Sequence, residues 1–205
     1  MKDSYKQSLK WSFFISFVTL ILSSGFTIAS TAVLAGVNFA IGMLVVFFII
    51  IIGVFFDMLG LAAASGEEKP YHAMAAERIN GAKHAIQIVR NADKFSNFCN
   101  DVIGDIAGIV SGTATAGVVL SLVFEFGYGK DSFHYSFLAV LFTAIVAAMT
   151  VGGKAIGKTF AINNSMMIIL KVGKFFYFIE KNFHITIFSG VKNGKRKVRG
   201  KNGIK

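Results

Sequence analysis

The sequence is short of the residues that a soluble or secreted domain needs. Only 16% of its 205 residues are charged, whereas globular chains carry charge on about a quarter of theirs. A single cysteine, Cys99, excludes a disulfide within the chain, and a single proline, Pro70, excludes proline-rich linkers. Hydrophobic residues make up 54% of the chain, which includes 22 phenylalanines. This composition predicts an all-α, polytopic helical membrane protein.

Sequence motifs of enzymes are absent as well. The sequence has no glycine-rich loop of the kind that binds dinucleotides or phosphates, and its four histidines lack a metal-binding spacing. Cys99 has no histidine near it in sequence, so we interpret it as a buried structural thiol. We therefore predict that the protein is not an enzyme and has no catalytic residues and no cofactor.

Four stretches are long and apolar enough to cross a bilayer, which takes about 20 residues at 1.5 Å each. They cover about residues 11–34, 39–64, 98–124 and 133–151. The first is too long for a signal peptide and is followed at once by the second. We therefore predict two transmembrane hairpins, at 11–64 and 97–155.

The positions of the basic residues predict the orientation. With four spans, all but Lys130 of the 21 lysines and arginines lie on one side, which places both termini in the cytoplasm. The net charge of +10 sits beside apolar runs, which favours anionic lipid at that face over nucleic acid. The lysine-rich composition and compact size suit a bacterial plasma membrane, the inner membrane.

Four further segments lie on the predicted cytoplasmic side. Residues 1–10 and 189–205 are basic, and the second of these is predicted to be disordered. Residues 65–96 predict two short helices, one to about Arg78 and one from Ala82 to Arg90. Residues 156–188 predict an amphipathic juxtamembrane helix, because lysines interrupt its apolar clusters; a fifth span is the alternative.

Three aspartates and one asparagine within the spans are candidate ligands of a metal ion. Asp101 and Asp105 are four residues apart, so their carboxylates share one helical face, which Asn97 extends by a turn. Two such carboxylates repel unless a cation lies between them, and their oxygens suit Mg²⁺ or another hard cation. Asp57, the only charge in the first predicted hairpin, is placed to reach the same site from a neighbouring helix.

Two of these residues also have a simpler interpretation. Asp101 lies near the start of its span, where water or a basic neighbour such as Lys94 or Arg90 would neutralise it. The alternative for Asp57 is a lone polar residue hydrogen-bonded to a neighbouring helix or located close to the inner interface.

Glycines at two places are predicted to shape the helices. The spacing of Gly104, Gly108 and Gly112 is typical of close packing between membrane helices. The pair Gly152-Gly153, followed by Gly157, is expected to weaken the end of the fourth span, where the helix bends toward the interface.

Several short motifs follow one another between about residues 50 and 180. They are Phe55-Phe56-Asp57, Gly81-Ala82-Lys83 with Ala85, Asn91-Ala92-Asp93-Lys94-Phe95, Ala107-Gly108-Ile109-Val110-Ser111-Gly112, and lastly Lys158-Thr159, Ala161-Ile162 and Asn164. In order and spacing they resemble the transmembrane domain shared by the CNNM proteins and the bacterial CorB and CorC magnesium transporters.

The resemblance implies a dimeric helical domain with a cation site among three core spans, closed on the cytoplasmic side by a belt-like juxtamembrane helix. In the family, side-chain oxygens one turn apart on the middle span contribute to that site, and Asp101 and Asp105 fall at or beside those positions. Asp57 falls within the matching serine-rich segment of the preceding span. The predicted function is transport of a divalent cation, Mg²⁺, by a homodimer, with the ligands Asp101, Asp105, Asp57 and Asn97.

The chain departs from the family pattern in three ways. The acidic residue of the family's small-Ser-Glu motif appears as Gly60, and the Glu and Pro of its Gly-Glu-x-x-Pro-Lys segment appear as Gly153 and Gly157. The CBS domains that usually follow are not in this sequence, and an additional span precedes the domain. The alternative function is accordingly a non-transporting membrane partner or regulatory protein that keeps the fold of the transporter domain.

Overall fold

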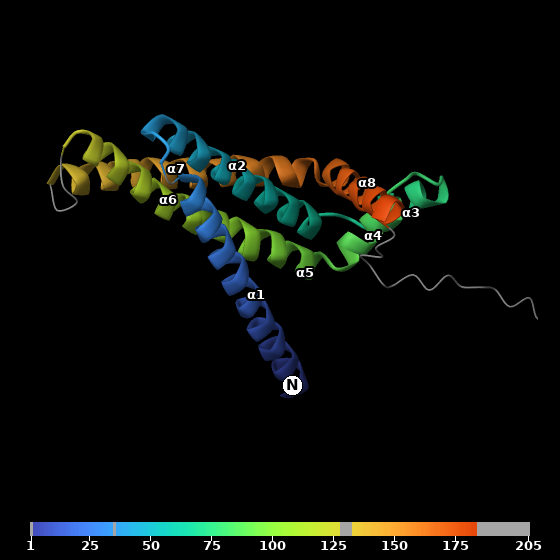
Figure 1. Cartoon of the computed structure of the whole chain (residues 1–205). Coiled ribbons are helices and arrows are strands. Elements are labelled where there is room, and N and C mark those ends of the chain that lie inside the picture. The colour runs from blue at the N-terminus through green and yellow to red at the C-terminus, as the bar shows by residue number, and fades with distance from the viewer. Residues whose placement is uncertain (1, 35, 128–132, 184–205) are drawn as a thin grey trace, which may run out of the picture.

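The computed structural model describes residues 2–34, 36–127 and 133–183, and over these ranges it contains helices and no strand. The predicted all-α fold is confirmed (Figure 1). The helices are α1 (Lys2–Leu34), α2 (Phe39–Ala64), α3 (Lys69–Ala76), α4 (Ala82–Arg90), α5 (Ala92–Asn97), the π-helix η1 (Phe98–Gly104), α6 (Asp105–Glu125), α7 (Phe133–Asn163) and α8 (Ser165–Phe183).

Four stretches of helix are long and apolar enough to cross a membrane, which makes the chain a multi-pass helical membrane protein. They are Ser12–Leu34, Phe39–Ala64, Ala92–Glu125 and Phe133–Asn163. The third of them consists of α5, η1 and α6, which follow one another without a break.

Helices α2, α6 and α7 lie side by side and form a three-helix bundle (Figure 1). The span that contains α6 is the most buried of the three. Within its apolar stretch 50% of the residues are buried, against 22% for α2 and 6% for α7. Glycines on α2 allow its close approach to α6: a Cβ on Gly42 would lie 2.7 Å from Val118 Cγ2, and one on Gly53 would lie 2.8 Å from Ala107 Cβ. Helix α1 crosses α6 obliquely, and its N-terminal part projects from the bundle.

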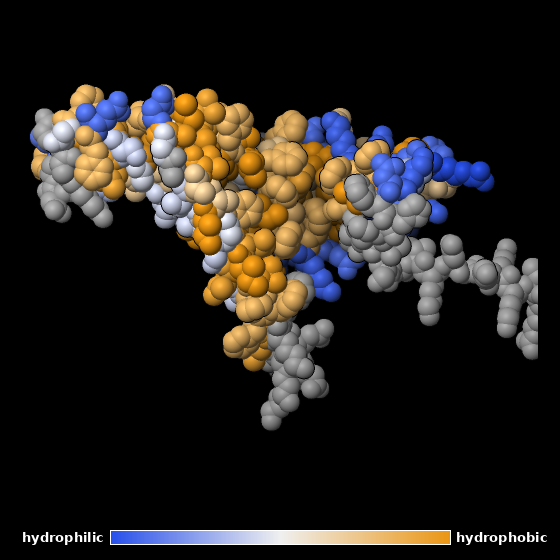
Figure 2. Space-filling view, viewed as in Figure 1, coloured by the Kyte–Doolittle hydropathy of each residue, from blue (hydrophilic) through white to orange (hydrophobic). Residues whose placement is uncertain are grey.

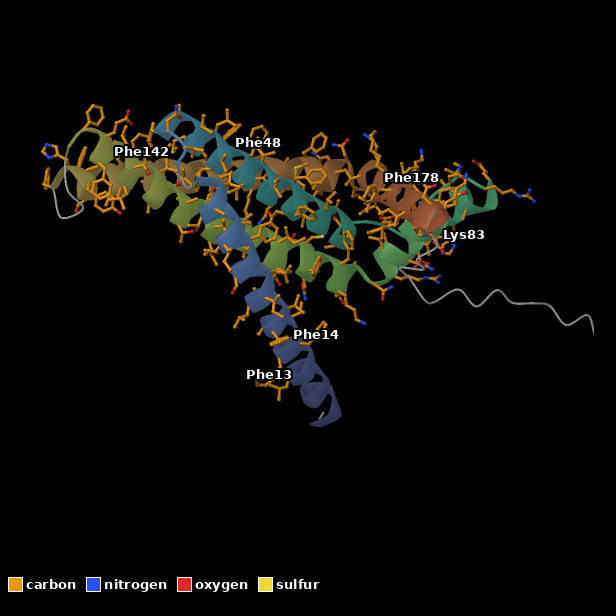
Figure 3. All side chains as sticks on the ribbon, viewed as in Figure 1. Phe13, Phe14, Phe48, Lys83, Phe142 and Phe178 are labelled. Carbon is orange, nitrogen blue, oxygen red and sulfur yellow. The ribbon has the colours of Figure 1, made fainter. Side chains whose placement is uncertain are left out.

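Large apolar side chains cover the outside of the molecule. Phe13, on the projecting part of α1, is 76% exposed, and Phe48 and Phe178 are also exposed (Figure 3). Hydrophobic residues extend over the middle of the molecule, whereas hydrophilic ones gather at the end where α3, α4 and α8 lie (Figure 2). We call the end formed by α3, α4 and α8 the basic end. An apolar surface of this extent is unfavourable in water and matches hydrocarbon.

Polar side chains mark the ends of the bundle helices. Asn38 caps α2, because its side chain accepts a hydrogen bond from the Ile41 N–H at 3.0 Å. At the other end of α2, the Ser65 hydroxyl donates to the Leu61 carbonyl at 2.8 Å. Asn164 separates α7 from α8, and its side chain donates to the carbonyl of Phe160 at 3.0 Å.

Helices α3, α4 and α8 pack together at the basic end, and the two short helices predicted within residues 65–96 are confirmed as α3 and α4. Tyr71, Ile88 and Ile169 are fully buried between them. The backbones of α4 and α8 touch, because neither Gly81 nor Gly173 has room for a Cβ against the other segment. Gly81 also has a φ of 86°, a left-handed conformation that favours glycine.

The structure moves two predicted boundaries. The predicted hairpin 97–155 is too short and the juxtamembrane helix 156–188 starts too early, because α7 continues to Asn163 and α8 begins at Ser165. Gly153 and Gly157 do not break α7. They let it pack against α2, where a Cβ on Gly157 would lie 2.7 Å from Met58 Cγ. The continuous helix of the third candidate span begins at Ala92, within the predicted segment 65–96.

The remaining predicted segments have different outcomes. Residues 1–10, predicted as a separate basic segment, belong to α1 from Lys2 onward. The predicted basic tail 189–205 and the loop with Lys130 lie outside the described residues. Within the described ranges, α8 does not qualify as a span by length and composition, which disfavours the alternative of a fifth span.

Candidate cation site

Asp57 is a buried carboxylate in the apolar helix α2. It is 5% exposed and is the only charged residue of this helix. It lies seven residues before the end of α2, about 10 Å along the helix axis from the basic end. A carboxylate in this position is costly without a compensating positive charge.

That positive charge comes from Lys154 on α7. Its ammonium nitrogen lies 3.6 Å from Asp57 Oδ1 and also 3.6 Å from Asp105 Oδ1, so one cation is shared by carboxylates from α2 and α6. The Lys154 side chain is 21% exposed, and that of Asp105 is 65% exposed. The pair Asp57–Lys154 is therefore enclosed, whereas Asp105 stands at the outer edge of the group.

Two buried oxygen atoms in the same helix interface have no hydrogen-bond donor within the described residues. They are Asp57 Oδ2 and Asn100 Oδ1. Asn100 donates its own amide N–H to Ser96 Oγ at 3.2 Å, which leaves its carbonyl oxygen directed at Gly60 of α2. Buried acceptors without donors cost free energy, and a cation or a water molecule is what would satisfy them.

The π-helix η1 sets the register of these groups against α2. It brings Asn100 opposite Gly60 and Gly104 opposite Asp57, where a Cβ on Gly104 would lie 3.5 Å from Asp57 Oδ1 and 3.6 Å from Lys154 Nζ. A side chain larger than alanine at Gly104 would therefore reach the ion pair. Short π-helices within membrane or soluble helices are frequent at functional sites.

The structure brings together two of the four predicted ligands. Asp57 and Asp105 meet at Lys154, so the cation that they share is a side chain of the protein itself. The side chains of Asp101 and Asn97 are exposed and stand apart from this group. Arg90, one predicted neighbour of Asp101, pairs instead with Glu68 at 2.6 Å.

No group of three or more His, Cys, Asp or Glu side chains within the described residues is arranged to hold a metal ion. The predicted set of four ligands is therefore not assembled in this conformation, because Asp101 and Asn97 lie on the outward side of η1 and α5. Of the three glycines that are predicted to pack closely against another helix, only Gly104 lies at such a contact within the described residues. Gly104 is buried, whereas a Cβ on Gly108 or on Gly112 would meet nothing within 4 Å.

Sequence reasoning missed Lys154 and Asn100. Lys154 falls among the predicted cytoplasmic lysines, because the fourth span is predicted to end before it. Neither residue has a signal in the sequence, since the place of Lys154 depends on the packing of α7 against α2 and the burial of Asn100 depends on the register that η1 imposes.

No protein-family profile, curated protein or solved structure matches this chain. The fold and the site therefore define its class, a multi-pass helical membrane protein with a charged cluster between three packed helices.

Proposed function

We propose that this protein is an integral membrane transporter of a divalent cation, Mg²⁺, which binds between α2, η1–α6 and α7. The observation that carries the proposal is the buried Asp57 carboxylate. One of its oxygens already faces a cationic group at 3.6 Å, and its other oxygen has no donor within the described residues. An ionisable group at such a position marks an ion pathway more often than a structural contact.

The ligands we propose are oxygen atoms, as a hard cation requires. Asp57 and Asp105 supply carboxylates and Asn100 supplies an amide carbonyl oxygen. Mg²⁺ keeps several water molecules when it binds proteins, so a partly hydrated ion would take the place between the two carboxylates that the Lys154 ammonium group now holds.

Uptake by purified protein tests the proposal. In proteoliposomes that contain a Mg²⁺-sensitive dye, Asp57→Asn should lower the rate of Mg²⁺ uptake by at least about tenfold, because the buried ligand loses its charge. The matched control is Asp101→Asn, which removes an exposed carboxylate from η1 and should stay within about twofold of wild type. No uptake by wild type, or equal uptake by wild type and Asp57→Asn, would contradict the proposal.

The second candidate function is a non-transporting partner protein, and Lys154 is the observation that favours it. Lys154 neutralises one of the two carboxylate charges without a bound metal and leaves the cluster with one net negative charge. This candidate requires that wild-type protein moves no Mg²⁺ and that the chain co-purifies with a defined membrane protein. The uptake assay above therefore separates the two candidates.

We also propose that a second copy of the chain covers the outward face of the third span. Asp101 is exposed there, and Gly108 and Gly112 leave open space along the same helix. Small residues let membrane helices approach closely, and carboxylates exposed to lipid are unfavourable. A homodimer would bury both features.

The basic end is proposed to face the cytoplasm of a bacterial cell and to contact anionic lipid of the plasma membrane. Lys171 and Lys174 are exposed on α8 beside the exposed ring of Phe175, a combination suited to a lipid headgroup region. A membrane-impermeant maleimide applied to intact cells should therefore not label a Lys171→Cys variant, and rapid labelling would reverse the proposed orientation.

A further inference from the structure

We infer that Lys154 is an internal counter-cation: the transported ion displaces its ammonium group from Asp57 and Asp105, and the ammonium group returns when the ion leaves. The inference rests on the proposed function, since it assigns a role within the same site. It concerns a residue that the predicted ligand set did not contain.

The Lys154 nitrogen lies at the same distance, 3.6 Å, from one oxygen of Asp57 and one of Asp105, which is where a cation shared by both carboxylates would sit. These separations fit an ion pair without short hydrogen bonds. An ammonium group on a flexible four-carbon chain is able to leave such a position without a backbone change.

Glycines of α7 bring Lys154 to this place. Gly153 and Gly157, on either side of Lys154 in the sequence, face Val54 and Met58 of α2, and a Cβ on Gly153 would lie 3.1 Å from Val54 Cγ2. The missing side chains let α7 approach α2 closely enough for Lys154 to reach Asp57. The close helix packing and the position of the cation therefore depend on the same short segment.

Asp57 and Asp105 carry two negative charges, which Lys154 reduces to one. A divalent ion added beside Lys154 would give these three residues and the ion a net positive charge and would place like charges within a few ångströms of each other. A divalent ion that replaces Lys154 leaves the group neutral. Binding of Mg²⁺ and occupancy by Lys154 are therefore mutually exclusive.

This exclusion has a consequence for the transport cycle. With Lys154 in place, the protein without bound Mg²⁺ has no uncompensated pair of carboxylates. It is therefore able to change back to the conformation that accepts the next Mg²⁺ without binding a second ion. Without the ammonium group, the carboxylates hold Mg²⁺ more tightly and the empty state becomes unfavourable. The protein would then exchange one Mg²⁺ for another but would take up little net Mg²⁺.

The test compares net uptake with exchange in proteoliposomes. Lys154→Met removes the charge and keeps a similar chain length, and Lys154→Arg keeps the charge as the matched control. For Lys154→Met we expect net Mg²⁺ uptake to fall by at least about tenfold and the half-saturating Mg²⁺ concentration to fall by about tenfold, because a like charge is removed from the site. Exchange of isotopically labelled for unlabelled Mg²⁺ should stay within about twofold of wild type. Lys154→Arg should retain net uptake.

Thermal unfolding in detergent supplies a second readout that does not need transport. Lys154→Met should unfold at a lower temperature than wild type without Mg²⁺ and should recover more than wild type does when Mg²⁺ is added, because the ion replaces the missing charge. A variant that no Mg²⁺ concentration stabilises would overturn the inference.

Two further outcomes would also overturn it: unchanged net uptake in Lys154→Met, or a parallel loss of net uptake and exchange, which is what a purely structural lysine gives. The proposed function fails separately. It fails when Asp57→Asn keeps both net uptake and exchange, whatever the Lys154 variants do.

Discussion

Gly60 of α2 and the side chain of Asn100 of η1 occupy the same space: a Cβ at position 60 would overlap the Asn100 carbonyl oxygen. The oxygen at that place therefore comes from η1, through Asn100, and not from a side chain of α2. The absence of a side chain at Gly60 and the buried amide of Asn100 are parts of one arrangement.

The first prediction follows from this overlap. Gly60→Ala should push Asn100 and η1 away from α2, at a cost of about 1–3 kcal/mol for overpacking a closely fitted interface. The variant should unfold at a lower temperature in detergent and should also take up Mg²⁺ more slowly. The control is Gly108→Ala, because a Cβ there meets nothing within 4 Å. Equal stability of the two variants would contradict the overlap.

The second prediction concerns Tyr71, which is outside the spans. Burial raises the pKa of Tyr71 to about 12, and its hydroxyl donates to the Met166 carbonyl at 3.3 Å, which joins α3 to α8. Because the folded state holds this proton more tightly than the unfolded state, its contribution to stability is complete below about pH 10 and declines as the pH rises toward 12.

Tyr71→Phe should therefore lower stability at neutral pH by about 0.5–1.5 kcal/mol, the usual value of one hydrogen bond. It should also flatten the loss of stability that wild type shows above about pH 10. The measurement is thermal unfolding in detergent across this pH range. Tyr177→Phe, which changes a partly exposed tyrosine of α8, is the control. An unchanged alkaline slope in Tyr71→Phe would show that Tyr71 is not the group responsible.

The third prediction concerns Glu68, which precedes α3. Hydrogen bonds from Arg90, and then from His72, lower the pKa of this carboxyl group. A carboxyl group with a lowered folded-state pKa stabilises the protein above its usual pKa of about 4.3, and this contribution is lost as the pH falls through the lowered value.

Glu68→Gln should consequently be slightly less stable than wild type near neutral pH, and the difference should disappear in acid and in high salt, because the pair is partly exposed. Thermal unfolding at low and high ionic strength measures both effects. Glu67→Gln, which changes the exposed neighbouring carboxylate, should leave stability unchanged at each pH. A salt-independent loss in Glu68→Gln would mean that packing, and not charge, is what the residue supplies.

The fourth prediction tests the proposed homodimer. Cys99 is buried, so in a Cys99→Ala background a single cysteine placed at Gly112 reports only on the outward face of α6. Gly112→Cys should form a disulfide-linked dimer in membranes under oxidising conditions, because small residues mark close helix contacts. A cysteine at Val119, which is buried within the chain, should not. The absence of cross-linking at position 112 would place the interface elsewhere.

The spans and the candidate acids were predictable because they depend on local properties of the sequence. Hydropathy and length placed the four spans, and the predicted start and end of the second, 39–64, agree with α2. The rarity of charge within apolar runs selected Asp57 and Asp105, which the structure brings to one cation. Whether that group transports an ion stays a prediction.

The tertiary structure alone decided which polar groups meet. Lys154 joins the site because α7 continues past its glycines and packs against α2, and Asn100 is buried because η1 shifts the helix register opposite Gly60. Asp101 remains outside for the same reason. Sequence by itself determines which segments enter the membrane, because the cost of burying charge in hydrocarbon is a property of each residue. The tertiary structure determines which charges neutralise each other, because that depends on distances of a few ångströms between residues about 50 to 100 positions apart.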